Sequence, residues 1–192
     1  MILKKWENIP DNIKNEKTKD YYDILNSKKI TLFLKRLFDI IFSTILLIVL
    51  SPILIILAIA IKIDSKGPIF YRQERITQYG KIFKIFKFRT MIFNADKIGA
   101  LVTTKNDSRI TRVGNIIRKC RLDEIPQLIN ILVGDMTFVG TRPEVKKYVE
   151  KYTPEMKATL LMPAGVTSIA SIKYKNEDEI IGKYIEQGEN ID

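Results

Sequence analysis

One segment dominates the pattern of hydrophobic and polar positions: residues 40–61 contain no charged side chain. A straight helix of this length reaches about 33 Å, at about 1.5 Å per residue, which matches the hydrocarbon thickness of a bilayer. The segment is apolar on all sides, whereas a helix that covers a soluble core is apolar on one face only. The pattern therefore predicts one membrane helix over residues 31–63.

Ser51 and Pro52 lie at the centre of this helix. Proline removes a backbone donor and bends a helix, and the Ser51 hydroxyl can satisfy backbone groups that lipid leaves without partners. Basic residues lie on both flanks, whereas a spanning helix usually has them on its cytoplasmic side. The pattern favours a re-entrant helix with a break at Ser51-Pro52. An ordinary spanning helix that tolerates its proline remains the alternative. The basic residues of the two flanks are Lys28, Lys29, Lys35, Arg36, Lys62, Lys66, Arg72 and Arg75.

In the rest of the chain, hydrophobic and polar residues alternate over shorter segments, which predicts short helices and strands. Residues 1–30 are mostly polar and predict a loosely ordered arm with a short helix near 21–25. Residues 69–72 and 81–89 predict two strands that form a hairpin around a turn at 77–80. Further helices are expected at 91–100, 111–121, 123–133, 145–152, 154–161 and 178–187, and a strand at 167–174.

These elements predict an α+β, mainly helical fold: a re-entrant N-terminal membrane helix, a small β-hairpin, and interfacial amphipathic helices around a compact cytoplasmic catalytic domain. The expected boundaries are a polar arm at 1–30, the membrane helix at 31–63 and the catalytic domain at 64–192.

Composition narrows the chemistry. The 192 residues carry a formal net charge of +10, which suits an anionic lipid surface or phosphate-bearing ligands. There is no histidine, which excludes histidine bases, histidine metal ligands and Ser-His-Asp catalysis. The only cysteine, Cys120, forms no disulfide within the chain and fits a reducing cytoplasm.

Asp123 and Glu124 are the candidate catalytic groups. Pro126 suits the first turn of a helix, which puts Asp123 at or near the N-cap, where the helix dipole favours an ionised carboxylate. A carboxylate beside a bound phosphate can act as a nucleophile, and a second one can hold Mg²⁺. Simple helix capping is the alternative for this pair.

Cationic residues elsewhere strengthen the catalytic interpretation. Arg142 lies on a turn before a predicted helix, where its planar guanidinium could bind a diphosphate. Lys87 and Arg89 alternate with phenylalanines and so share one face of a predicted strand. The alternatives are a surface salt bridge for Arg142 and a solvated or lipid-facing strand for the other two.

The order of these motifs resembles the bacterial sugar transferase family of small monotopic phosphoglycosyl transferases. The resemblance covers roughly residues 31–170. The matching segments are 35–39 (KRLFD), Ser51-Pro52, 67–73 (GPIFYRQ), 86–91 (FKFRTM), Arg118, 122–128 (LDEIPQL), 130–136 (NILVGDM), 140–144 (GTRPE) and 163–167 (PAGVT).

The resemblance implies transfer of a phosphosugar from a UDP-sugar to polyprenyl (undecaprenyl) phosphate, with release of UMP. This would be the first membrane step of capsule, exopolysaccharide, O-antigen or glycoprotein glycan synthesis, at the cytoplasmic face of the bacterial inner membrane. It implies membrane lipids as further partners and assigns no oligomeric partner. The implied catalytic residues are Asp123 as nucleophile, Glu124, Lys87 and Arg118; the implied phosphate-binding residues are Arg142, Thr141, Glu144 and Arg89; the implied Mg²⁺ ligands are Glu124 and Asp123.

Two departures and two other function classes complete the analysis. Residues 168–174 (SIASIKY) differ from the Gly-Trp-Ala-Gln-Val-Asn-Gly stretch of many relatives, and the chain stops at Asp192 where relatives continue, so a C-terminal truncation is expected. A non-catalytic basic membrane adaptor would explain the charge and the apolar helix, but not Asp123-Glu124. A nucleic-acid binder is disfavoured because no known nucleic-acid motif is present.

Overall fold

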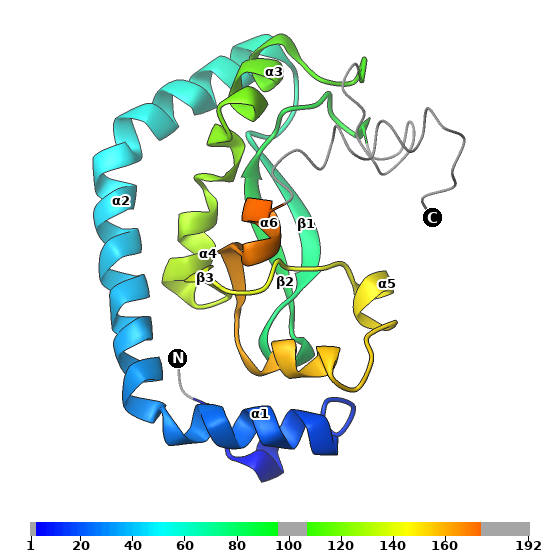
Figure 1. Cartoon of the computed structure of the whole chain (residues 1–192). Coiled ribbons are helices and arrows are strands. Elements are labelled where there is room, and N and C mark those ends of the chain that lie inside the picture. The colour runs from blue at the N-terminus through cyan, green and yellow to red at the C-terminus, as the bar shows by residue number, and fades with distance from the viewer. Residues whose placement is uncertain (1–2, 96–106, 174–192) are drawn as a thin grey trace.

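The computed structural model describes residues 3–95 and 107–173, with the side chains of 170 and 171 outside the description. One long helix, α2, runs along one side of the molecule, and the short helices and strands pack on its inner side (Figure 1). The described part is mainly helical with two small sheets. The helical elements are η1 (Trp6–Asn8), α1 (Glu16–Ser27), α2 (Lys29–Asp64), η2 (Gln78–Gly80), α3 (Arg112–Lys119), η4 (Leu122–Glu124), α4 (Gln127–Val133), α5 (Lys146–Val149), η5 (Met156–Leu161) and α6 (Ile169–Lys173).

α2 is the predicted apolar helix. It is the one helix in the described ranges that is long and apolar enough to cross a membrane. It continues through Pro52, and Ser51 Oγ donates to the carbonyl of Ile48 at 2.8 Å, within the turn that the proline disturbs. Figure 1 shows the helix curved, with its C-terminal part turned across the end of the molecule.

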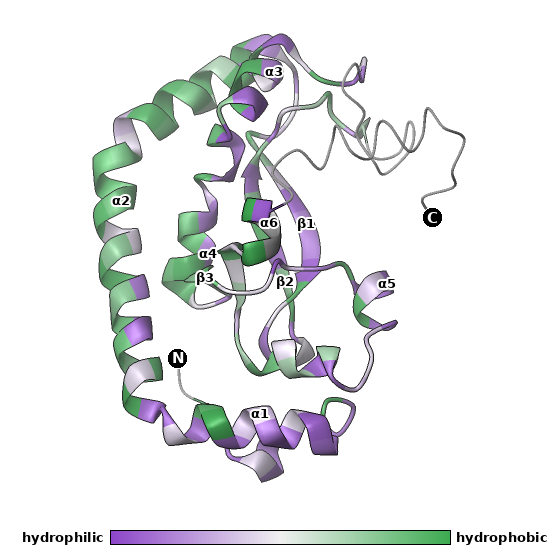
Figure 2. Ribbon diagram, viewed as in Figure 1, coloured by the Kyte–Doolittle hydropathy of each residue, from purple (hydrophilic) through white to green (hydrophobic). Residues whose placement is uncertain are grey.

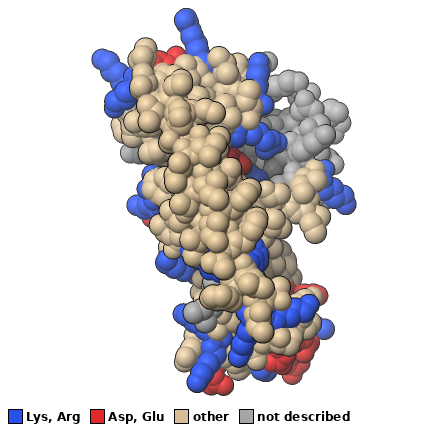
Figure 3. Space-filling view, turned by 90° about the vertical axis from the view of Figure 1, so that its left-hand side faces the viewer, with Lys and Arg blue, Asp and Glu red and all other residues tan. Residues whose placement is uncertain are grey.

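The two sides of α2 differ in their contacts. Leu46, Leu47 and Leu50 pack into the core around α4, and Leu54, Leu57 and Ile61 pack against α3 and the hairpin. The opposite side is a continuous apolar surface (Figures 2 and 3) with basic side chains at its margins. The more exposed apolar residues along this side include Ile41, Ile45, Ile48, Val49, Ile55, Ile56, Ile59 and Ile63.

Three polar side chains near the start of α2 fix it to the rest of the fold. Asp39 is fully buried and accepts hydrogen bonds from Thr137 Oγ1 at 2.7 Å and Phe138 N at 3.3 Å. Lys35 also donates to Thr137 Oγ1. Arg36 donates to the carbonyls of Ile131 and Leu132 at the C-terminal end of α4, where cations are favoured.

The predicted hairpin is confirmed. β1 (Phe70–Ile76) pairs antiparallel with β2 (Ile82–Phe88), and Tyr71 lies opposite Lys87. The connecting turn contains Tyr79 and Gly80, both with positive φ. Two such residues in a tight turn match the right-handed twist of paired strands.

A second sheet pairs β3 (Met136–Val139) with β4 (Ala164–Thr167) in parallel. Gly140 and Gly165 lie so close that a Cβ on Gly165 would fall 2.2 Å from the Gly140 nitrogen. The prediction of a strand at 167–174 is wrong, because β4 ends at Thr167 and α6 follows. The strand begins earlier because its partner β3 offers hydrogen bonds there.

The N-terminal arm is ordered, contrary to the prediction. α1 has twelve residues, and Asn15 caps it by accepting from Thr18 N at 2.9 Å. Tyr22 joins Ile9 and Ile13 in a hydrophobic cluster with Leu160 and Leu161 of η5. Contacts distant in sequence therefore order a segment whose composition is polar.

The other predicted helices differ in length or type. The helix expected at 145–152 is the four-residue α5, and the one at 154–161 is the 3-10 helix η5. At 91–100 the described residues form a bridge between Met91 and Ile110 and a turn rather than a helix, and 96–100 lie outside the described residues. The helix expected at 178–187 also lies outside them.

Candidate active site

Asp123 and Glu124 lie on the 3-10 turn η4 between α3 and α4. Thr111 caps α3 by accepting from Gly114 N at 3.0 Å, and Arg121 then adopts a left-handed backbone with φ 52°, which turns the chain into η4. The expectation that Asp123 caps the following helix is wrong. α4 begins at Gln127 and its N-cap position holds Pro126, so neither acid occupies the N-cap of α4.

Lys87 of β2 reaches this turn. Its Nζ lies 2.8 Å from Glu124 Oε1, and both side chains are about one quarter exposed. The hairpin thus supplies a cation to the acidic pair from a distant part of the sequence, as predicted for a site that contains Lys87, Asp123 and Glu124.

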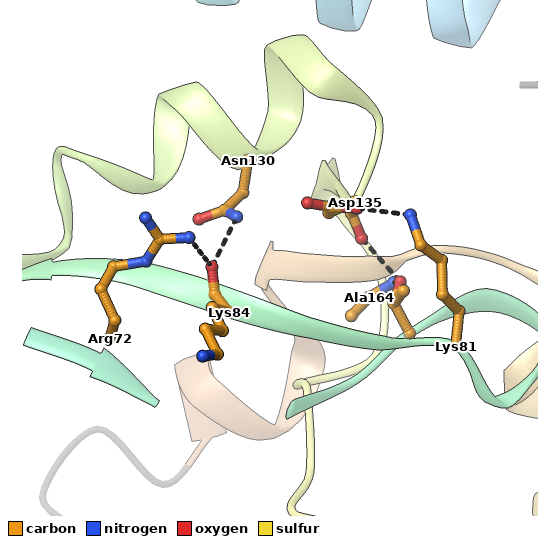
Figure 4. A network of polar contacts seen from close by, with 7 residues as sticks. Arg72, Lys81, Lys84, Asn130, Asp135 and Ala164 are labelled. Carbon is orange, nitrogen blue, oxygen red and sulfur yellow. Dashed lines mark hydrogen bonds and ion pairs between the residues drawn. The ribbon is translucent and has the colours of Figure 1, made fainter. Parts of the chain in front are cut away.

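Asn130 fixes α4, the helix that follows the acidic pair, to β2, the strand that carries Lys87. Its amide Oδ1 accepts from Phe86 N at 2.8 Å, and its Nδ2 donates to the Lys84 carbonyl at 3.1 Å (Figure 4). Arg72 donates to the same carbonyl from β1. Asn130 is buried, and its two bonds satisfy both polar atoms of its own amide inside the fold. Sequence reasoning gave Asn130 no such role.

A cavity of about 590 Å³ opens beside Asp123. Lys87 and Arg118 line the cavity together with Asp123. β1 contributes further polar groups that sequence reasoning did not assign to the site, although their alternation on a strand beside Lys87 was a usable signal. The polar residues of the cavity wall are Tyr71, Arg72, Gln73, Arg75, Lys87, Arg89, Thr90, Asn94, Arg109, Arg118 and Asp123.

Arg89 lies in the wall of this cavity but its guanidinium is committed to α2. The side chain is 5% exposed, and Nη2 donates to Ser65 O at 2.7 Å and to Ser65 Oγ at 2.8 Å, while Nη1 donates to Lys66 O at 3.1 Å. These bonds cap the C-terminal end of the long helix. The contacts of Arg89 are therefore those of a structural cap, whereas the sequence suggested a phosphate ligand.

Thr141, Arg142 and Glu144 lie on the turn after β3. Arg75 Nη1 donates to the Pro143 carbonyl at 3.3 Å, and Ile76 N donates to the Glu144 carbonyl at 2.9 Å, which fastens the turn to β1. Gly165 N donates to the Thr141 carbonyl at 2.7 Å. Thr141 and Arg142 are exposed and are not among the residues that line the 590 Å³ cavity. The charge of Arg142 nevertheless acts on Glu124.

The two acids have opposite pKa shifts. Burial raises the pKa of Asp123, and Glu124 adds to this while Lys87 and Arg118 oppose it. Burial also acts to raise the pKa of Glu124, but the charge and hydrogen bond of Lys87, with Arg142 and Arg121, outweigh it and the pKa is lowered. Neighbouring acids with divergent pKa values are typical of active sites.

The acidic pair can also be tested for Mg²⁺ binding. Within 3–95 and 107–173, no group of three or more acidic or cysteine side chains could hold a metal ion. Mg²⁺ often uses only one or two carboxylates and takes its other ligands from water and substrate phosphates. Asp123, which lines the cavity, and the adjacent Glu124 fit that arrangement.

Comparison with known proteins gives a consistent result. Residues 30–189 match the family model described as "Bacterial sugar transferase". The chain is 41% identical over 160 residues to the UDP-glucose:undecaprenyl-phosphate glucose-1-phosphate transferase of Klebsiella pneumoniae, which covers 80% of this chain and 34% of that protein. It is 37% identical to the undecaprenyl-phosphate galactose phosphotransferase of Salmonella typhimurium, over 79% of this chain and 35% of the relative.

A shorter relative aligns over most of its length. The exopolysaccharide production protein PSS of Rhizobium leguminosarum is 40% identical over 149 residues, which is 74% of each protein. The chain thus spans about a third of the first two relatives and about three quarters of this one. Residues 1–29, which include α1, lie outside the family match.

Proposed function

Because the chain belongs to the bacterial sugar transferase family, we propose that it transfers a phosphosugar from a UDP-sugar to polyprenyl phosphate. The observation that carries this proposal is the position of Asp123, which lines a cation-lined cavity next to the ion pair of Lys87 with Glu124. Two relatives, the Klebsiella pneumoniae and Salmonella typhimurium proteins, act on undecaprenyl phosphate according to their names, which supports polyprenyl phosphate as the acceptor.

The proposed first step forms a covalent intermediate. An oxygen of the Asp123 carboxylate attacks the phosphorus that bears the sugar. The new O–P bond forms as the bond from that phosphorus to the bridging oxygen breaks, and UMP leaves with the bridging oxygen. The raised pKa of Asp123 supports this role, since a more basic carboxylate is a better nucleophile once ionised. Lys87 and Arg118 stabilise the charge on the phosphoryl oxygens.

The proposed second step releases the product. A phosphate oxygen of polyprenyl phosphate attacks the same phosphorus, the bond to the Asp123 oxygen breaks, and the carboxylate is restored. The product is a polyprenyl diphosphate sugar. Asp123 and Glu124 would hold Mg²⁺, which when bound offsets the negative charge of the donor phosphates.

The membrane arrangement follows from α2. Its inner side contacts the globular part from Lys35 to Ile61, and its outer side is apolar. We infer that the apolar outer side of α2 lies in one leaflet of the membrane. The helix bends at Ser51-Pro52, so that both of its ends stay at the cytoplasmic face. If α2 spanned the membrane, the charged domain that packs on its inner side would have to enter the lipid. This costs several kcal/mol for each polar group left without a partner.

The test replaces Asp123 by asparagine, which keeps the shape but removes the nucleophile. Asp123→Asn is expected to reduce UMP release from a UDP-sugar and polyprenyl phosphate by about 10⁴-fold or more, while membrane association is retained. Asp20→Asn, on the exposed side of α1, is the matched control and should leave turnover unchanged. Mass spectrometry of protein treated with donor alone should find the phosphosugar on residue 123. An adduct on another residue, or undiminished turnover of the variant, would refute the mechanism.

A further inference from the structure

The cavity beside Asp123 is lined by both cationic and apolar side chains. Its cations include Lys87 and Arg118. The apolar residues of its wall are Pro68, Phe70, Phe88, Met91, Ile92, Phe93 and Ala95. Phe93 is 55% exposed and Ile92 is 41% exposed, so two large apolar side chains of this cavity are open to the surroundings.

This apolar wall lies at the end of the membrane helix. A Cβ on Gly67, three residues after the last residue of α2, would fall 3.1 Å from the Phe93 Cβ. Ile63, in the last turn of α2, is 82% exposed. Exposed apolar side chains therefore occur on both sides of the short connection between α2 and the cavity.

The segment that carries Ile92 and Phe93 is held in place by backbone hydrogen bonds. Ile92 N donates to the Arg109 carbonyl at 2.9 Å, and Thr111 N donates to the Thr90 carbonyl at 3.0 Å. The backbone of this segment is thus held at Thr90 and Ile92, and a contiguous exposed apolar patch is typical of a binding surface.

We propose that Ile92 and Phe93 bind the first isoprene units of the acceptor, whose phosphate lies toward Lys87 and Arg118. The inference rests on the proposed function and adds the position of the acceptor chain to it. A molecule with an anionic head and a hydrocarbon tail complements a cavity that is lined by both cations and large apolar side chains. A nucleotide sugar has no hydrocarbon segment that could cover these two side chains.

The kinetic test removes the apolar surface. Phe93→Ser is expected to raise KM for a long-chain polyprenyl phosphate about tenfold, because loss of one aromatic contact costs roughly this factor, and to leave KM for the UDP-sugar unchanged. Ile24→Ser, at a 54% exposed position on α1, is the matched control. With an acceptor that carries a short water-soluble chain, the difference between Phe93→Ser and wild type should disappear. An unchanged acceptor KM, or an equal rise for both substrates, would overturn the proposal.

A binding test separates this inference from the proposed reaction because it needs no turnover. A polyprenyl phosphate with a photoreactive diazirine in its first isoprene units should label residues 92 and 93 of the wild-type protein, and unlabelled acceptor should compete. Labelling confined to the outer side of α2 would overturn the inference even if the enzyme is active. Labelling at 92 and 93 without any UMP release would support the inference and refute the proposed function.

Discussion

Asp123 and Glu124 are adjacent in the chain, and the structure gives them different environments. Lys87 donates its hydrogen bond to Glu124 and helps to lower the pKa of that acid. Burial is the largest effect on Asp123, and the pKa of Asp123 is raised. Two acids whose pKa values are pushed apart can take different roles. This difference supports our proposal that Asp123 is the nucleophile, and it identifies Glu124 as the acid that Lys87 binds.

The raised pKa of Asp123 leads to a prediction about pH. The nucleophile must be ionised, so kcat/KM for UMP release should fall as the pH drops through the pKa of Asp123, at a higher pH than an ordinary aspartate would give. Lys87 lowers this pKa, so Lys87→Met should move the acid limb to higher pH. Glu124 raises it, so Glu124→Gln should move the limb to lower pH.

The measurement is the pH profile of kcat/KM for the three proteins at one ionic strength. Both variants are also expected to lose rate, so the position of the limb, and not its height, is the readout. Shifts in the same direction for both variants would contradict the assignment.

Among the elements, α3, α4 and the hairpin connect α2 to the site. Arg36 binds the last carbonyls of α4, and Asp39 binds Thr137 of β3, which follows α4. Leu54, Leu57 and Ile61 of α2 pack against α3 and the hairpin. The acidic pair lies between α3 and α4, and Asn130 of α4 binds β2 beside Lys87. α2 is therefore joined to the elements on both sides of the acidic pair.

Loss of the buried Asp39 carboxylate should destabilise the fold. Asp39→Ala leaves Thr137 Oγ1 and Phe138 N without the acceptor that they share, and it removes the carboxylate 3.9 Å from Lys35 Nζ. Breaking a buried charged contact of this kind costs about 3–5 kcal/mol. Urea unfolding in detergent micelles should show the loss. Thr44→Ala on the same helix, whose hydroxyl binds only the Ile40 carbonyl, should change the free energy of unfolding by less than about 0.5 kcal/mol. Equal stability of the two variants would contradict the role of Asp39.

At the scale of the whole molecule, α1, the hairpin and α4 all lie on the inner side of α2 (Figure 1). The segments before and after α2 belong to the same packed body, since α1 packs on η5 and β1 pairs with β2. A membrane cannot pass between them without separating these contacts. This arrangement supports a helix that enters the leaflet and returns.

Topology follows as a prediction. Single cysteines at Asp20 and Glu74, both exposed, lie before and after α2 and can be introduced into a Cys120→Ser background. A membrane-impermeant maleimide should label both in inverted inner-membrane vesicles and neither in intact spheroplasts. Labelling of the two positions from opposite sides would show that α2 spans the membrane.

The success of sequence reasoning varied with the range of the contacts involved. Residues 40–61 and the hairpin at 70–88 were predictable because hydrophobic periodicity and turn residues are local signals. α1 was missed in most of its length because its apolar residues are few, and it is stabilised by Leu160 and Leu161 far along the chain. Arg89 and Asn130 could not be interpreted correctly from sequence, since their roles depend on carbonyl groups of other elements.

The sequence by itself determined the apolar helix, the acidic pair at 123–124, the absence of histidine chemistry and the family, because these depend on residue identity and spacing along the chain. Only the tertiary structure decided which cation meets which acid, that Arg89 caps α2, and that the apolar residues at 92 and 93 face the same cavity as Asp123. The physical reason is that hydrogen bonding, burial and pKa depend on neighbours in space, which the folding of distant segments brings together.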